Sequence, residues 1–151
     1  MASLVTNRGK YLILQGVFRN AGLPTSFYMA LADQTTTPTV DHNAFSEHTE
    51  VPAGNGYTSG GIALARNATD WDVLTEDDTN DRALVQAKDL VWTASGGNLP
   101  ASGTGARWLD CLDDNVTIGS RQIFGSFDLA SNRTVSDGQT LTIQNAEFRL
   151  T

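Results

Sequence analysis

The chain has 151 residues, is 40% hydrophobic and carries a formal net charge of −7. One domain of this length buries roughly 70% of its unfolded surface, so we expect a single domain over residues 1–151. The ten basic residues are scattered singly along an acidic chain, which argues against direct binding to nucleic acid. No apolar run approaches the ~20 residues of a transmembrane helix, and we find no secretory signal, so we expect no membrane partner and synthesis in a cytoplasm.

The N-terminal part of the chain predicts one short helix, over residues 7–18. Thr6 precedes it as a helix N-cap, and a mostly apolar face follows at helical spacing. That face consists of Lys10, Ile13, Leu14, Val17, Phe18 and Ala21. Gly9 and Gly16 each weaken the helix by about 1 kcal/mol relative to Ala, so packing must hold it. We interpret it as a helix that closes one end of a β-sandwich; an amphipathic helix that binds a partner is the alternative.

A central strand and a long loop follow. Residues 26–32 read as a strand with apolar side chains on both faces. Residues 33–56, the long loop, are polar and without clear periodicity, which is uncommon inside a compact domain. This loop is either a surface excursion with one helical turn near residues 42–47 or an arm that grips a partner. Residues 57–66 then resume a strand, with Ile62 and Leu64 facing inward.

The middle of the chain alternates acidic, apolar and glycine-rich segments. Residues 70–81 are strongly acidic, and we predict a solvated loop there. Residues 82–94 predict two short strands or one bent strand, and residues 96–105 a flexible loop. Residues 106–112 predict a further strand that places Leu109 and Cys111 on one face.

The last segment, residues 122–150, shows the clearest period-two alternation. Apolar residues recur from Ile123 to Leu129 and again from Leu141 to Ile143, with Asp137-Gly138 as a turn signal between them. We therefore expect antiparallel strands linked by a hairpin. About seven or eight strands separated by turn signals favour a mainly β fold, an antiparallel β-sandwich (jelly-roll-like) with one short N-terminal helix.

No segment predicts a reaction centre. The acidic residues 70–81 lack the spacing of a calcium-binding loop. His42 and His48 stand in a polar loop without a nucleophile elbow, and we expect surface histidines. Cys111 is expected to be a small buried hydrophobe rather than a nucleophile. The sequence therefore predicts no catalytic residue, no cofactor and no metal, and thus no enzyme.

Two alternatives to this conclusion stay open. Trp71, Trp92 and Trp108 would serve either as core residues, the default for aromatic residues in strands, or as a sugar-stacking face. A pair of catalytic carboxylates is defined by its separation in space, which a sequence does not give. A carbohydrate-binding module and a hydrolase with carboxylates in its loops are therefore the rival classes.

Four stretches together resemble small structural proteins of tailed bacteriophages. They are LVTNRGKYLILQGVF (residues 4–18), FYMALAD (27–33), GNGYTSGGIALARNATDW (54–71) and FGSFDLASNRTVSDGQTLTI (124–143). The resemblance spans most of the chain, and its motifs describe folding elements rather than a functional site. The chain departs from the group's pattern at Gln139, where Asp is common, and in its extended long loop.

This resemblance implies a capsid decoration (cement) protein that binds the outside of the shell and bridges major capsid protein subunits of the same phage. It places the chain in the virion after synthesis in the host bacterial cytoplasm, and leaves a homo-oligomer open. A tail-associated structural protein is the alternative. We expect residues 1–6 to act as a partner-binding arm together with the long loop, with capsid contacts at Ser3, Leu4, Val5 and Phe45.

Overall fold

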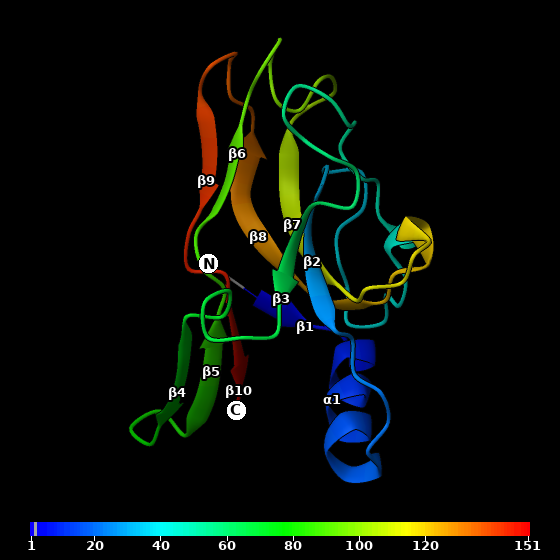
Figure 1. The fold of residues 1–151 in the computed structure, drawn as a ribbon, viewed down its shortest axis with the longest axis vertical. Helices are drawn as coiled ribbons and strands as arrows, with labels where there is room; N and C mark the ends of the chain where they lie inside the picture. The colour runs from blue at the N-terminus through cyan, green and yellow to red at the C-terminus, as the bar shows by residue number, and fades with distance from the viewer. Residues whose placement is uncertain (2) are drawn as a thin grey trace.

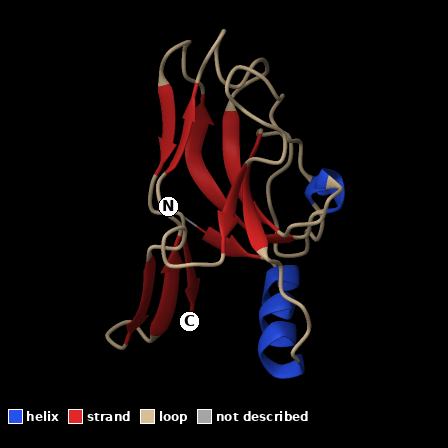
Figure 2. Cartoon of the chain, viewed as in Figure 1, coloured by secondary structure: helices blue, strands red, loops and turns tan. Residues whose placement is uncertain are grey.

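The computed structural model describes residues 1 and 3–151 and shows a mainly β protein, with 41% of residues in strands and 13% in helices. The sheets are antiparallel and a single α-helix lies near the N-terminus, which confirms the predicted fold class (Figures 1 and 2). The elements are β1 (Ser3–Val5), α1 (Asn7–Arg19), β2 (Ser26–Ala32), the 3-10 turn η1 (Phe45–Glu47), β3 (Ile62–Ala65), β4 (Val73–Asp77), β5 (Arg82–Gln86), β6 (Leu90–Thr93), β7 (Ala106–Leu112), the 3-10 turn η2 (Ile118–Ser120), β8 (Ile123–Arg133), β9 (Thr140–Ile143) and β10 (Glu147–Leu150).

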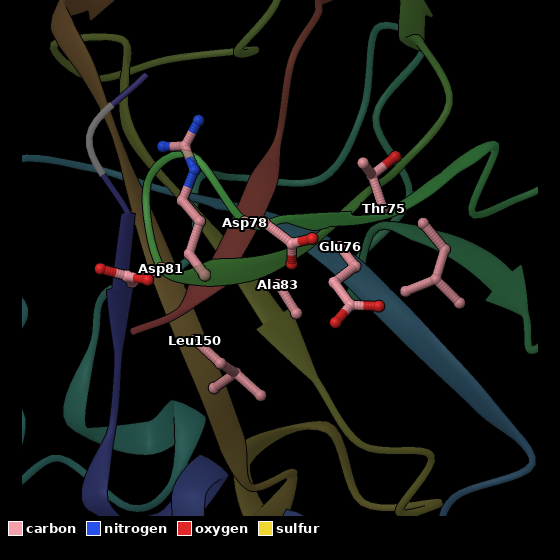
Figure 3. A pocket seen from close by; sticks show the side chains of 8 residues that line it. Thr75, Glu76, Asp78, Asp81, Ala83 and Leu150 are labelled. Carbon is pink, nitrogen blue, oxygen red and sulfur yellow. The ribbon is translucent and has the colours of Figure 1, made fainter.

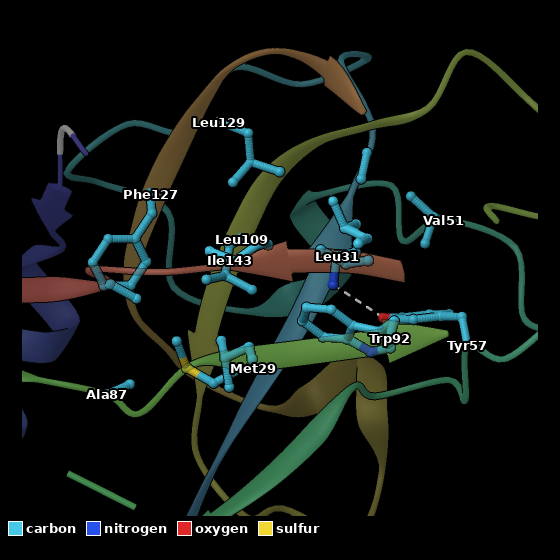
Figure 4. Close-up of a cluster of buried hydrophobic side chains, with 14 of the residues drawn as sticks. Met29, Leu31, Val51, Tyr57, Ala87, Trp92, Leu109, Phe127, Leu129 and Ile143 are labelled. Atoms are coloured by element: carbon cyan, nitrogen blue, oxygen red, sulfur yellow. Dashed lines mark hydrogen bonds between the residues drawn. The ribbon is translucent and has the colours of Figure 1, made fainter. Parts of the chain in front are cut away.

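A five-stranded sheet in the order β1-β8-β7-β2-β3 is the centre of the fold. The two-stranded ribbon β6-β9 covers one of its faces, and the sheets stay open rather than closing into a barrel (Figure 1). Alternating apolar residues explain the contact: Leu90 and Trp92 of the ribbon are buried, while Val91 between them is exposed. Figure 4 shows Trp92 beside Tyr57, facing the sheet residues of this core.

The opposite face of the same sheet is covered by the long loop. Phe45 N–H donates to the carbonyl of Arg121 at 2.9 Å, which brings the loop onto this face. Farther along the loop, Val51 N–H donates to the carbonyl of Leu31 at 3.0 Å and so pairs with β2 at its edge. A second buried cluster forms beneath the loop, made of Ala30, Ala32, Phe45, Leu112 and Ile123. The expected helical turn is present as η1, and the loop is fastened to the sheet at its buried residues Phe45, His48 and Val51.

Three further strands form a separate sheet that we call the wing, in the order β10-β5-β4. The wing and α1 both extend from the same end of the five-stranded sheet (Figure 1). On one wing face Leu74, Val85 and Phe148 lie opposite one another in register. Phe148 packs edge-on against Phe124 of β8, with ring centroids 5.1 Å apart, and this contact joins the wing to the central sheet.

Helix α1 begins as predicted at Thr6, whose buried side chain accepts the N–H of Gly9 at 2.9 Å. The same hydroxyl donates to the carbonyl oxygen of Ile123 at 2.5 Å, so the cap also fastens the helix to β8. Gly9 is the buried residue of the helix, whereas Leu14 and Phe18 are exposed. The expectation that this helix closes one end of the sandwich is therefore wrong, because its apolar residues do not pack into the core.

Two other expectations are corrected. The acidic residues 70–81 contain the strand β4, which pairs with β5 in the wing. The alternating segments β8 and β9 do not form a hairpin with each other: β8 pairs with β7 and β1, and β9 pairs with β6. Asp137-Gly138 does mark a turn, with Gly138 at φ 79°, but this turn carries the chain from the sheet to the ribbon.

The close approach of α1 to β8 depends on Gly9. A Cβ atom at this position would lie 2.1 Å from the carbonyl oxygen of Phe124. We expect Gly9→Ala to lower the free energy of unfolding by about 1–3 kcal/mol, as measured by urea denaturation, because such a site is overpacked. Gly22→Ala is the matched control, since its Cβ would meet nothing within 4 Å. Equal stability of Gly9→Ala and the wild type would contradict this account.

Candidate functional site

The N-terminal strand β1 lies at the edge of the five-stranded sheet and borders a surface hollow of about 470 Å³. We call this the N-terminal hollow. It is lined by Met1, Ser3, Leu4, Val5, Lys10, Val40, Arg149 and Thr151. Met1 and Val40 are exposed there, and Arg149 of β10 and the following Thr151 line the hollow as well. An edge strand beside an open hollow is a site at which a further strand can pair.

The direction of the backbone groups of β1 follows from its register. Thr6 N–H donates to the carbonyl oxygen of Phe124 at 3.1 Å, and the antiparallel pairing continues with Leu4 opposite Ser126. Residues alternate between hydrogen-bonded and non-hydrogen-bonded pairs along such a ladder. The N–H and C=O groups of Ser3 and Val5 therefore point away from β8, toward the outer edge of the sheet.

The long loop reaches the N-terminal hollow through Val40. Asn7 N–H donates to the carbonyl oxygen of Val40 at 2.7 Å, and the Asn7 side-chain amide donates to Asp41 Oδ1 at 2.9 Å. Asn7 is the first residue of α1, so the loop is held at the point where β1 ends. The two segments that the sequence suggests for partner contact thus meet at one surface.

A buried polar network fastens the middle of the long loop to the sheet. The Asp110 carboxylate, on β7, is fully buried; its Oδ2 accepts a hydrogen bond from His48 Nδ1 at 2.7 Å. Its Oδ1 accepts from the Ser126 hydroxyl at 2.5 Å. His48 Nε2 lies 2.8 Å from Nδ1 of His42, which carries the network toward the surface. The expectation that His48 is a surface histidine is wrong, because its imidazole is needed to pair a buried carboxylate.

This network does not present an activated nucleophile. The Ser126 hydroxyl donates to Asp110 rather than to a histidine, so neither imidazole is placed to take its proton. No local spacing connects this cluster, since Asp110 and His48 are 62 residues apart. The one indication in the sequence is Asp110 itself, an acidic residue inside a predicted apolar strand. If it is buried there, its carboxylate requires a hydrogen-bonding partner.

Glu50 and Tyr57 form a second fastening of the loop. Tyr57 Oη accepts the N–H of Leu31 at 3.0 Å (dashed in Figure 4) and donates to Glu50 Oε1 at 2.8 Å. Burial, and then the nearby Glu50 charge, raise the pKa of Tyr57. The phenol therefore stays protonated and keeps both hydrogen bonds.

The predicted contact residues fall in two places. Ser3, Leu4 and Val5 form β1 and line the N-terminal hollow, whereas residue 2 of the expected arm lies outside the described residues. Residues 3–5 are paired with β8, so this part of the expected arm is a strand of the sheet. Phe45 is 2% exposed and packs in the second core, so the expectation that its side chain touches a partner is corrected.

The other candidate residues are dispersed. Asp70 forms an ion pair with Lys88 at 2.5 Å, and Asp77 forms one with Arg82 at 2.8 Å, so the acidic stretch is divided between separate partners. A hydrogen bond from Lys88 lowers the pKa of Asp70, and hydrogen bonds from Asn80 and then Arg82 lower the pKa of Asp77. Over the described residues, no group of three or more His, Cys, Asp or Glu side chains is placed to hold a metal ion.

The tryptophans and the cysteine also serve packing. Trp92 lies in the core against the first sheet face, Trp71 packs edge-on against Phe27, and Trp108 borders the second core. They do not share one face as a sugar-stacking platform would require. Cys111 is buried as expected, and burial raises the pKa of its thiol.

Comparisons of this chain with protein-family models, with curated proteins and with solved structures find no match. Within the part of the chain that the structure describes, no helix is both long and apolar enough to cross a membrane.

The pairing of Asp110 generates a stability prediction. Asp110→Ala removes the acceptor of both His48 and Ser126, and we expect the free energy of unfolding to fall by about 3–5 kcal/mol, the cost of breaking a buried pair. Asp72→Ala removes an exposed carboxylate and should change it by no more than about 0.5 kcal/mol. Chemical denaturation of the two variants side by side measures the difference. If they prove equally stable, the network does not hold the loop.

Proposed function

We propose that this chain is a capsid decoration protein of a tailed bacteriophage, which binds the outside of the shell through the N-terminal hollow and bridges major capsid protein subunits. The observation that carries the proposal is the outer edge of β1. Two outward-facing residues, Ser3 and Val5, offer backbone N–H and C=O groups beside an open hollow. The resemblance of four stretches of the sequence to small phage structural proteins supports the same assignment.

The chemistry of the hollow suits a main-chain partner. An extended segment of a capsid subunit lying along β1 would gain backbone hydrogen bonds from the edge, as in other cases of strand addition. Leu4, Val5 and Val40 supply apolar surface at the same place, and Lys10 lies among the lining residues. Such a contact is modest by itself. Repetition over a symmetric shell, together with bridging of two subunits, raises the occupancy through avidity.

The rigidity of the site supports this function. β1 is paired with β8 in the central sheet, and Val40 is held by Asn7. The long loop is fastened by hydrogen bonds of two of its polar residues, from His48 to Asp110 and from Tyr57 to Glu50. A preorganised edge loses little conformational entropy when a partner segment binds.

The role of the β1 edge is tested by removing one N–H group. Ser3→Pro deletes the outward N–H of Ser3 and leaves the hydrogen bonds to β8 in place, since proline is tolerated at a sheet edge. An unmade hydrogen bond costs about 1–3 kcal/mol, so we expect affinity for expanded capsids to fall about tenfold or more in a co-sedimentation assay. Ser3→Ala keeps the N–H and should bind as the wild type does. Unchanged binding of Ser3→Pro, with an unchanged melting temperature, would remove the edge from the account.

The placement in the virion is tested by copy number. Mass spectrometry of purified phage particles should find the chain in hundreds of copies per particle, as binding to a repeated shell site requires. A handful of copies would instead assign it to the tail.

A further inference from the structure

Helix α1 leaves an apolar stripe uncovered. Tyr11, Leu14 and Phe18 follow one another at i, i+3 and i+7, which places them on one side of the helix. All three are exposed, Phe18 by 77%, and the buried Gly9 lies on the opposite side, where the helix touches β8. Val17 beside the stripe is exposed as well. The stripe thus faces away from the body of its own chain.

The wing carries two exposed leucines beside a surface hollow. Leu74 is 80% exposed and Leu150 is half exposed, and with Ala83 they border a hollow of about 870 Å³. Figure 3 shows Ala83, Leu150 and Glu76 at this hollow, with Asp78 and Asp81 at the end of the wing. The hollow is therefore lined by two leucines and by three acidic side chains, with Arg82 beside them.

The charges of the two surfaces are opposite. Helix α1 contains Arg8, Lys10 and Arg19 and no acidic residue. Residues 72–82 of the wing contain five acidic residues and one arginine. An isologous contact between two α1 helices would bring like charges together, whereas a contact between α1 and the wing pairs opposite charges.

The lengths of the two surfaces also match. The 13 residues of α1 extend about 20 Å at ~1.5 Å per residue, and the five residues of β4 extend about 17 Å at ~3.3 Å per residue. Within one chain, it is Ile13 rather than the stripe that lies toward the wing. Ile13 lines a smaller hollow together with Leu74, Ala83 and Leu150 of the wing, so these wing residues border their own helix on one side. The stripe of a chain is thus directed away from its own wing and is available to a second molecule.

We propose that two copies of this chain associate head to tail, with the Tyr11-Leu14-Phe18 stripe of one copy seated on the Leu74-Leu150 hollow of the next. Arg19 then lies near the acidic side chains of Glu76, Asp78 and Asp81. The contact is heterologous, so every copy keeps one free helix and one free wing, and the assembly either closes into a ring or grows as a chain. It uses surfaces other than the N-terminal hollow and concerns the purified chain, with or without a capsid.

Two variants, each defective in one of the surfaces, test this association. Phe18→Asp places a negative charge on the stripe, and Leu74→Lys places a positive charge in the hollow; both positions are exposed, so the fold should be retained. By sedimentation velocity at ~100 µM, we expect the wild type to self-associate and each variant alone to be monomeric. High salt should weaken the association of the wild type, because it screens the charges at the contact. Val116→Asp and Val116→Lys are the matched controls, because Val116 is 96% exposed and belongs to neither α1 nor the lining of the hollow, and they should associate as the wild type does.

Mixing the two variants gives the decisive result. Leu74→Lys keeps an intact helix and Phe18→Asp keeps an intact wing, so a head-to-tail contact predicts a one-to-one dimer in the mixture and no larger species. A mixture that stays monomeric would overturn the proposal, since it would mean that the stripe and the hollow do not bind each other. A monomeric wild type, or variants that associate as the wild type does, would overturn it as well. None of these outcomes depends on capsid binding, so the two proposals fail separately.

Discussion

The fully buried carboxylate of Asp110 is the constraint on which the covered face of the sheet depends. A charge removed from water is tolerated only when it is paired and hydrogen-bonded, and here His48 and Ser126 provide both partners. His48 belongs to the long loop, so satisfying the carboxylate also fixes the loop against the sheet. Phe45 of the same loop packs in the second core. Earlier in the loop, Val40 accepts a hydrogen bond from Asn7 N–H and borders the N-terminal hollow.

The same loop explains how a small fold can present rigid binding surfaces. One face of the central sheet is buried by the ribbon and the other by the loop, which leaves the edges and the end of the sheet to the solvent. The edge strand β1 offers backbone groups, whereas α1 and the wing offer apolar side chains with opposite charges nearby. In the proposed function these surfaces have different partners, the shell for the first and neighbouring copies for the second, so contacts with the shell and contacts between copies reinforce each other.

Local patterns in the sequence predict the elements well where one physical requirement dominates. Thr6 is predicted as the helix cap because its hydroxyl can accept a backbone N–H. Residues 26–32 are predicted as a strand from apolar residues on both faces, and residues 106–112 from their alternation. The strand β4 is missed because it is largely exposed, its acidic residues Glu76 and Asp77 fall on opposite faces, and its pairing partner is β5. Which strands pair is decided by long-range packing, so the alternation of β8 and β9 could not reveal that they belong to different sheets.

The candidate site was only partly predictable for the same reason. Ser3, Leu4 and Val5 are proposed as contact residues from their position in the chain, but the direction of their backbone groups requires the register with β8. Phe45 is apolar and lies in a polar loop, and without the loop's path its burial cannot be distinguished from exposure. The pairing of His48 with Asp110 joins residues far apart in sequence, which no local spacing records.

The location of the chain in the phage particle is the most direct test of the central proposal. A cryo-EM reconstruction of the head, at a resolution that traces the backbone, should show the chain on the outer surface with the β1 edge against a segment of the major capsid protein. Continuous density between Ser3–Val5 and an extended capsid segment is the expected result. Density for the chain only in the tail, or on the shell with the β1 edge open to solvent, would contradict the account.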